Sequence, residues 1–208
     1  MFLNVYLKLR THEGSIYLQP RSADTDGGLK MLTSTRLLLR ALEPDDLNST
    51  YLGWLNDPTV HRYLETRFLP QTMEALQRYW QEHRDDANSP WFAICLQADG
   101  RHIGNIKLGP IHWIHRRGDI SLFIGDRSCW GQGYATEAIA TLRDWAFAVH
   151  DLQKLTAGIY AGNPGSRRAF EKCGFILEGT LRAEVVSSGE RLDVWRMGLP
   201  RSMWRQVS

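Results

Sequence analysis

The sequence contains little cysteine, and what it has is scattered. Cys95, Cys129 and Cys173 are the three cysteines in 208 residues. An odd number of distant cysteines does not make a disulfide framework, and no two lie close enough in sequence to form a zinc-binding pair. We therefore expect a protein of a reducing cytoplasm that holds no metal.

A strong excess of one charge and long apolar runs are also missing. The 25 Lys and Arg residues nearly balance the 23 Asp and Glu residues, which leaves a formal charge of +2. A chain that grips phosphate backbones usually carries a basic excess, so nucleic acid is not an expected partner. No apolar run approaches the roughly 18 residues of a membrane-spanning helix, so a membrane is not an expected partner either.

The composition that remains is that of a soluble globular domain, with 43% apolar and 23% charged residues. The length predicts one domain with a sizeable core. The apolar start of the chain is broken by Asn4, Lys8 and Arg10, so it does not fit a signal peptide. We interpret residues 1–32 as an N-terminal extension, disordered or counted from too early a Met, rather than a functional arm. The domain is expected over 33–204.

Periodicity predicts mixed helices and strands after the extension. Alternating segments bounded by turn residues predict strands at 36–41, 91–96, 102–108, 119–124 and 154–160, and a final hairpin that turns at 187–189. Helical spacing predicts helices at 43–55, 71–83, 135–149 and 166–172, with a further turn at 58–64. This order predicts an α/β or α+β sandwich built around one sheet.

A glycine-containing segment lies between a predicted strand and the long helix. Residues 129–137 read Cys-Trp-Gly-Gln-Gly-Tyr-Ala-Thr-Glu. Gly131 and Gly133 can let successive backbone N–H groups turn toward one point at the positive end of a helix, which makes an anion site. The segment has neither the Lys-Ser/Thr of a phosphate-binding Walker loop nor the three glycines of a dinucleotide fingerprint. A plain glycine-rich turn remains the alternative.

A second segment gives the loop its context. Residues 163–175 read Asn-Pro-Gly-Ser-Arg-Arg-Ala-Phe-Glu-Lys-Cys-Gly-Phe. Together the two segments resemble the GNAT superfamily of N-acetyltransferases, whose loop is Gln/Arg-x-x-Gly-x-Gly/Ala and whose later helix starts at Asn and closes on Gly-Phe. Residues 133–135 match the end of that loop, whereas Trp130 stands where Gln or Arg is usual. The resemblance covers about 33–204. Its branch containing the ribosomal-protein alanine N-acetyltransferases is similar in 36–40, 54–58, 178–182, Gly189 and Asp193.

The resemblance implies an α/β (α+β) GNAT-like fold, with a mixed, mostly antiparallel twisted sheet that is flanked by helices and splayed after a strand bulge. It also implies acetyl-CoA as co-substrate and direct attack of a primary amine on the thioester, without a metal. A backbone N–H of one strand would stabilise the oxyanion. The residues implied in acetyl-CoA binding are Leu122, Phe123 and Ile124 on that strand, Gly131, Gln132, Gly133, Tyr134, Ala135 and Thr136 at the phosphates, and Asn163 and Ser166.

The acid and the base are less clear from the residues. Phe170 occupies the position of the tyrosine that many family members use as proton donor. Ser166 matches a serine thought to protonate the leaving thiolate, with a helix-capping role as the alternative. Glu184 lies one residue out of register with a glutamate of that branch, which in a strand changes the face. Asp119 opens the central strand, with a solvated strand-end carboxylate as the alternative. A water chain could also carry the proton.

The acceptor wall of this superfamily corresponds to 44–84. Four residues are expected to line the acceptor site: Trp54, Tyr63, Glu65 and Trp113. Glu65 could also act as the base from this wall. The acceptor is a protein N-terminus or a small amine such as an amino sugar, a polyamine or an aminoglycoside. A non-catalytic acyl-CoA-binding sensor is the alternative from another class. Monomer and homodimer both remain open.

Overall fold

The computed structural model describes residues 31–187 and 189–204. Residues 1–30 of the extension expected over 1–32 lie outside the described residues. Leu32, its last residue, already pairs with Leu39 in the sheet. None of the helices in the described ranges is both long and apolar enough to cross a bilayer.

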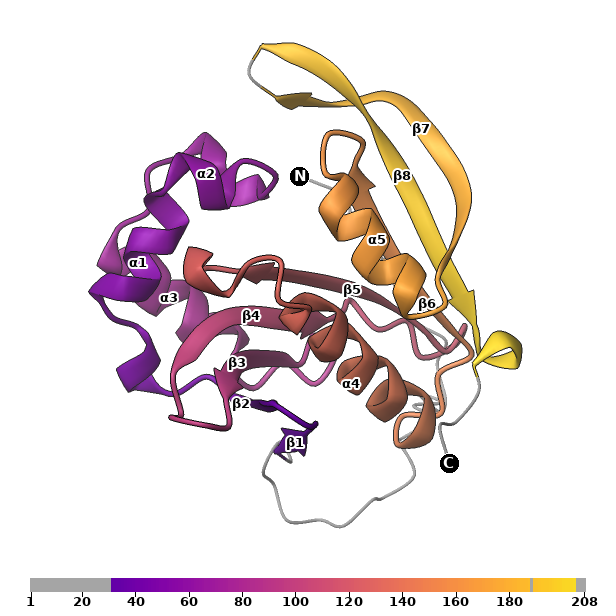
Figure 1. The fold of residues 1–208 in the computed structure, drawn as a ribbon, viewed down its shortest axis with the longest axis horizontal. Coiled ribbons are helices and arrows are strands. Elements are labelled where there is room, and N and C mark those ends of the chain that lie inside the picture. The colour runs from indigo at the N-terminus through magenta and orange to yellow at the C-terminus, as the bar shows by residue number, and fades with distance from the viewer. Residues whose placement is uncertain (1–30, 188, 205–208) are drawn as a thin grey trace, which may run out of the picture.

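One sheet organises the chain. Its eight strands lie in the order β1-β2-β3-β4-β5-β6-β8-β7 (Figure 1). Their bounds are β1 Leu32–Thr33, β2 Leu37–Ala41, β3 Trp91–Leu96, β4 His102–Leu108, β5 Arg117–Ile124, β6 Lys154–Tyr160, β7 Ile176–Ser187 and β8 Glu190–Pro200. All neighbouring pairs are antiparallel except β5 and β6, which the helix α4 connects. The mixed, mostly antiparallel sheet flanked by helices is therefore confirmed.

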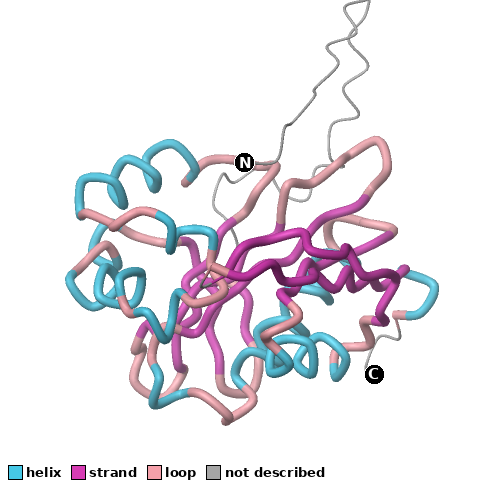
Figure 2. Tube along the Cα trace, turned by 90° about the horizontal axis from the view of Figure 1, so that it is seen from above, coloured by secondary structure: helices cyan, strands magenta, loops and turns pink. Residues whose placement is uncertain are grey.

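Helices cover the sheet unevenly. The α-helices are α1 Ser49–Asn56, α2 Pro58–His61, α3 Met73–His83, α4 Tyr134–Ala148 and α5 Pro164–Lys172. The short 3-10 turns are η1 Pro44–Asp46, η2 Glu65–Phe68, η3 Arg127–Cys129 and η4 Arg201–Met203. Helices α1 to α3 gather beside the β2–β4 part of the sheet, while α4 and α5 lie along the other side (Figures 1 and 2).

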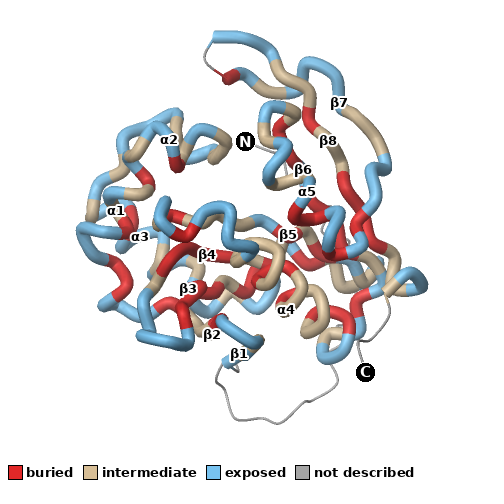
Figure 3. Tube along the Cα trace, in the orientation of Figure 1, coloured by how far each residue is buried: buried red, intermediate tan, exposed pale blue. Residues whose placement is uncertain are grey.

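The alternation of side chains along β3 explains two separate cores. Phe92 and Ile94 pack in the large core under α4 and α5. Ala93 and Cys95 point the other way, into a smaller core under α1 and α3. The β7–β8 hairpin extends beyond both cores, and its tip is mostly exposed (Figure 3).

The predicted elements agree with the structure except at a few ends. The segment predicted as one helix over 43–55 divides into η1 and α1. The Asn48 side chain accepts hydrogen bonds from the N–H groups of Thr50 and Tyr51, so it starts a new helix after η1. Strand β5 begins at Arg117, two residues before the predicted strand.

The sheet opens between β5 and β6. The two strands pair only from Arg117 opposite Lys154 to Asp119 opposite Thr156. Beyond that point β6 pairs with β8 alone, up to Tyr160. The ladder between β4 and β5 keeps one register from Gly104 to Leu108. The expected bulge in β5 is therefore wrong, and the splay comes from the divergence of β6.

Candidate active site

The glycine loop has the backbone conformation that only glycine adopts easily. Gly131 has a φ of 73° and Gly133 a φ of 85°. These left-handed values carry the chain from η3 into α4, whose first residue is Tyr134. The predicted segment 131–136 therefore forms the turn and the first residues of α4.

The start of α4 differs from that of every other α-helix in the described residues. Side chains of Asn48, Asp57, Thr72 and Asn163 cap α1, α2, α3 and α5. Gly133 precedes α4 and provides no side-chain cap. The first N–H groups of a helix have no partner within the helix, so those of α4 remain directed at the space before it. This is the geometry of an anion site.

A clamp holds the start of α4 in place. It is formed by Ser34 and Arg36, which precede β2, and by Glu137 on α4. The Arg36 guanidinium donates to the Gln132 carbonyl at 3.0 Å and to the Glu137 carboxylate at 2.7 Å. The Ser34 hydroxyl donates to the same carboxylate at 2.8 Å. Burial works to raise the pKa of Glu137, but the hydrogen bonds from the Arg36 N–H, from Ser34 and from the guanidinium lower it. Arg36 also lies over the Tyr134 ring.

Trp130 links the loop to the open edge of β5. Its indole Nε1 donates to the Ile124 carbonyl at 2.8 Å, and the residue is 42% exposed. A Gln or Arg, usual in the resembled family, could donate a hydrogen bond as well. Trp130 thus supplies a hydrogen-bond donor next to β5, as Gln or Arg could.

The edge of β5 that faces β6 has unpaired backbone groups. The N–H of Gly109 donates to the Asp119 carbonyl and the N–H of Gly125 to the Ile103 carbonyl, so the odd positions of β5 bond to β4. In an antiparallel pair the even positions then point away. The N–H groups of Leu122 and Ile124 therefore face the gap that β6 leaves. Phe123 instead packs its side chain beside Trp54.

The start of α5 contains two further candidates. The Asn163 Oδ1 accepts from the Ser166 N–H at 3.1 Å, so Asn163 and not Ser166 caps the helix. No hydrogen bond of the Ser166 hydroxyl occurs within the described residues, and the capping alternative for Ser166 is not supported. Phe170 is 2% exposed and packs against Phe175 in the large core.

Asp119 stands at the point where β5 and β6 part. Its carboxylate accepts from the Thr156 hydroxyl at 2.7 Å and from Arg196 at 3.2 Å. Arg196 on β8 crosses β6 at Gly158, where a Cβ atom would come within 2.9 Å of its Nη1. Burial raises the pKa of Asp119 in spite of the hydrogen bonds from Thr156 and Arg196. The Asp119 side chain is therefore not simply a solvated carboxylate at the end of a strand.

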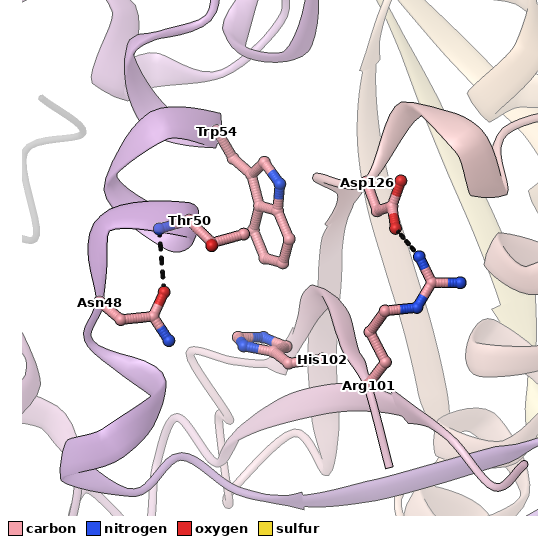
Figure 4. Close-up of a pocket in the computed structure, with 6 residues that line it drawn as sticks. All are labelled: Asn48, Thr50, Trp54, Arg101, His102 and Asp126. Carbon is pink, nitrogen blue, oxygen red and sulfur yellow. Dashed lines mark hydrogen bonds and ion pairs between the residues drawn. The ribbon is translucent and has the colours of Figure 1, made fainter. Parts of the chain in front are cut away.

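The expected acceptor residues lie in three different places. Trp54 lines a cavity of about 460 Å³ beside α1. Its indole packs edge-on against the His102 ring, with the ring centroids 5.1 Å apart, and the Arg101–Asp126 ion pair forms another wall (Figure 4). The remaining lining residues are Asn48 and Thr50.

Tyr63 and Glu65 lie instead at the end of β6. The Tyr63 hydroxyl donates to the Gly162 carbonyl at 2.5 Å. The Tyr160 hydroxyl donates to the Glu65 carboxylate. These contacts connect the η2 segment to the segment between β6 and α5, across the opening of the sheet.

Two expected site residues, Trp113 and Glu184, lie away from the other candidates. Trp113 donates to Asn88 and packs its ring near His150, beyond the C-terminal end of α4. This is the end opposite the glycine loop, so the expected acceptor role of Trp113 is not supported. Glu184 is exposed, in the stretch of β7 where the register with β8 shifts.

Sequence reasoning missed several residues of this region. The contacts that join the loop and the strands of this region are made by Arg36, Glu137, Tyr160 and Arg196. Glu137 could have been found, because it is an acid in the first turn of a helix that starts without a capping side chain. The others depend on contacts between distant segments, for which the sequence contains no local signal.

Comparisons with known proteins agree with this geometry. A family model described as an acetyltransferase (GNAT) domain matches residues 36–176. The spermidine N(1)-acetyltransferase of Vibrio cholerae serotype O1 is 28% identical over 171 residues, covering 82% of this chain and 96% of that protein. That of Escherichia coli strain K12 is 30% identical over 163 residues, covering 76% and 83%. The crystal structure of spermidine N-acetyltransferase from Vibrio cholerae in complex with CoA and spermine superposes with a TM-score of 0.74 at 27% identity, covering 82% of this chain and 98% of that chain.

Proposed function

The chain belongs to the GNAT acetyltransferase family and is an acetyl-CoA-dependent N-acetyltransferase, and from this premise we propose that its acceptor is a primary amine of a small polyamine such as spermidine. The observation that carries the proposal is the opening between β5 and β6, which has the uncapped start of α4 on one side and carboxylates on the other. The relatives named as spermidine acetyltransferases favour the polyamine within the amines that this opening could admit.

The roles of the donor-side residues follow from their placement. The N–H groups at 131–136 bind the pyrophosphate of acetyl-CoA, and the clamp of Arg36 and Glu137 keeps them aligned. The N–H groups of Leu122 and Ile124 stabilise the oxygen of the thioester carbonyl as it gains charge. Asn163 contacts the pantetheine arm with its free amide group. The Ser166 hydroxyl protonates the departing thiolate.

Carboxylates on the acceptor side suit a cationic acceptor. The Glu65 side chain, which contacts Tyr160 at the end of β6, is 66% exposed. Asp119 lies where the pairing of β5 with β6 ends. Thr156, which contacts Asp119, and Tyr160, which contacts Glu65, are four residues apart on one strand, which corresponds to about 13 Å. Asp119 is already paired with Arg196, so Glu65 is the carboxylate that a nitrogen of the acceptor can reach.

The resemblance to the ribosomal-protein alanine branch makes a peptide N-terminus the second candidate acceptor. Several residues behind that resemblance make contacts that hold β7 to β8 and to β6. Asp193 accepts from the Ala183 N–H and from Arg182, each at 2.8 Å, and Glu178 pairs with Lys154 at 2.6 Å. They stabilise the hairpin, which is why the polyamine is preferred.

The test is a CoA-release assay with acetyl-CoA and a panel of amines, read with a thiol reagent. All three cysteines are buried, so the colour reports released CoA. We expect spermidine or spermine to raise the rate far above hydrolysis without amine. The panel includes alanine- and serine-starting peptides, aminoglycosides and amino-sugar nucleotides as the competing acceptors.

Each result has a distinct meaning. Turnover with peptides and not with polyamines would overturn the proposed acceptor and favour the alanine branch. Binding of acetyl-CoA in a calorimeter without turnover of any amine would favour the non-catalytic sensor. Absence of binding would remove the donor site from the glycine loop.

A further inference from the structure

We propose that Tyr160 and Glu65 form the proton relay that deprotonates the acceptor amine. In this relay Tyr160 Oη takes a proton from the ammonium group while its own proton passes to the Glu65 carboxylate. The inference rests on the proposed acetyl transfer to a cationic amine, and it does not depend on which amine is the substrate.

The other candidates for the acid and the base offer no free group for this step. Phe170 has no hydroxyl and lies in the core. The Asp119 carboxylate already accepts hydrogen bonds from Thr156 and Arg196. An amine that is protonated at neutral pH cannot attack a carbonyl until a proton has left it, so a base on the acceptor side is needed.

Tyr160 lies on the correct face of the opening for such a base. Leu155, Ala157 and Ile159 of β6 point into the core under α4 and α5. Residues at the alternate positions, Thr156, Gly158 and Tyr160, therefore face the other side, where Thr156 contacts Asp119. Tyr160 is the last residue of the stretch of β6 that has separated from β5.

The hydrogen bonds around Tyr160 have the direction that a relay requires. The phenol donates its proton to the Glu65 carboxylate. The Arg67 Nη1 donates one hydrogen bond to the phenol oxygen at 3.1 Å and another to the Leu64 carbonyl at 2.6 Å. A hydroxyl oxygen can donate once and accept twice, so one acceptor position of Tyr160 Oη is left for a substrate N–H.

Arg67 holds both members of the pair, by its hydrogen bond to Tyr160 and by a long ion pair with Glu65. Its guanidinium is mostly buried, lies 4.9 Å from the Tyr160 ring centroid, and donates to the Val186 carbonyl on β7 at 2.6 Å. The Arg67 Nη1 and the Glu65 Oε1 are 4.0 Å apart. The Glu65 side chain is 66% exposed, so a proton delivered to it can leave to solvent.

The other groups that face the relay do not compete for its proton. Tyr63 packs edge-on against the Tyr160 ring, with its hydroxyl bonded to the Gly162 carbonyl. On the neighbouring β8, Arg196 lies opposite Gly158, two residues before Tyr160. Burial, followed by the hydrogen bond to Glu65, raises the pKa of Tyr160, so the phenol keeps its proton until the carboxylate accepts it.

The protons and bonds balance over one turnover. The ammonium loses one proton through Tyr160 to Glu65 and becomes a neutral amine. Its nitrogen forms a bond to the acetyl carbon, and the bond from that carbon to sulfur breaks. The nitrogen then releases its second proton, which passes through the Ser166 hydroxyl to the thiolate, so that sulfur leaves as the thiol of CoA and Ser166 keeps its hydroxyl. Glu65 gives its proton to water and is ready for the next amine.

The test compares Tyr160→Phe and Glu65→Gln with wild type over pH 6.5 to about 10.5, with acetyl-CoA and the best amine of the panel. We expect kcat/KM to fall about 100-fold in both variants near pH 7, which is at the lower end of the rate enhancement that a general base usually contributes. We expect the difference to shrink as the pH nears about 10.4, the ordinary value for an alkylammonium, because the amine is then neutral without help. Acetyl-CoA affinity should not change.

Two exposed residues of α3 provide matched controls. Tyr79→Phe removes a phenol hydroxyl and Glu82→Gln a carboxylate outside the site, and both variants should keep the wild-type pH profile. Thermal unfolding of each variant shows whether it folds, and Glu65 is exposed enough that its change leaves the core intact.

Two results would overturn the relay. One is a Tyr160→Phe profile equal to that of wild type. The other is a loss that stays constant over the whole pH range, which would indicate only a structural link between η2 and β6. Failure of the proposed function is separate, because it would already appear as wild-type protein that turns over no amine.

Discussion

Gly131 and Gly100 have almost the same backbone conformation but different surroundings. Their φ values are 73° and 72°, and a Cβ atom at either position would meet no atom within 4 Å. Gly100 lies in the turn between β3 and β4, and Gly131 lies in the loop before α4. The pair therefore separates the general cost of a left-handed residue from the specific requirement of the donor site.

Gly131→Val should reduce acetyl-CoA affinity at least tenfold, because a branched side chain disfavours the left-handed φ that directs the loop N–H groups. The backbone strain should cost about 1–2 kcal/mol of folding free energy. Isothermal titration with acetyl-CoA and a urea melt measure the two effects.

Gly100→Val is the matched control for this prediction. It should show the same loss of folding free energy and wild-type affinity for acetyl-CoA. Equal affinities of the two variants would mean that the loop at 131–136 does not bind the donor.

Trp113 and Phe170 show what residue identity can and cannot predict. The absence of a hydroxyl at Phe170 is a property of the residue itself, so its unsuitability as a proton donor was readable from the sequence. The surroundings of Trp113 depend on the segment containing Asn88 and on the end of α4, which are distant in sequence. No local pattern distinguishes an aromatic residue in a cleft from one that closes the end of a core.

At the scale of elements, the segment before α1 is held by a partly buried ion pair. Arg40 on β2 donates two hydrogen bonds to Asp46, at 2.6 and 2.8 Å. The Asp46 carboxylate also accepts from the Glu43 N–H at 2.8 Å, which closes η1. Through this pair β2 sets where η1 ends and where α1 can begin.

Asp46→Asn should destabilise the fold by about 1–3 kcal/mol at pH 7, because it leaves buried hydrogen-bonding groups of Arg40 without their full partner. Burial works to raise the pKa of Asp46, but the hydrogen bonds from Arg40 and from the Glu43 N–H lower it overall. A lowered pKa means that the ionised group stabilises the fold above its unfolded pKa of about 3.9, and that this is lost as the pH falls through the folded value.

Urea unfolding of wild type and Asp46→Asn at pH 7 and in acid measures this dependence. The difference between the two should shrink as the pH falls. Asp45→Asn is the control, because Asp45 is exposed beside Asp46 and should have little effect at either pH. A difference that is independent of pH would contradict the role of the charge.

Boundaries between elements were harder to predict than the elements themselves. The period-two patterns predicted β3, β4 and β6 with their observed ends. The division of 43–55 into η1 and α1 comes with the Asn48 cap of α1 and with the contact of Asp46 to Arg40 on β2. Apolar spacing alone is the same for one bent segment and for two separate ones.

At the scale of the whole molecule, the proposed donor site joins segments that are distant in sequence. The loop before α4, the edge of β5 and the start of α5 lie around one opening, and β1 and β2 reach it through Ser34 and Arg36. A ligand that contacts all of these segments binds only the folded chain.

Acetyl-CoA should therefore raise the unfolding temperature, with a stabilisation that grows as the logarithm of its free concentration above the Kd. At a free concentration 100 times the Kd the stabilisation should be about 2.7 kcal/mol. Differential scanning fluorimetry with increasing acetyl-CoA measures it, and Gly131→Val should need at least tenfold more ligand for the same shift. A wild-type unfolding temperature that does not change would contradict binding to the folded protein.

The sequence by itself determined the class of the protein, because that information is local. The glycines at 131 and 133, the segment that begins at Asn163 and the alternation of apolar residues each act within a few positions of the chain. In the structure both glycines have left-handed φ values and Asn163 caps α5. The tertiary structure decided which groups meet around the opening. Tyr160 reaches Glu65, and Arg196 crosses Gly158 to Asp119, only because strands distant in sequence become neighbours. Contacts of this kind depend on packing between elements, and no periodicity or motif along the chain encodes them.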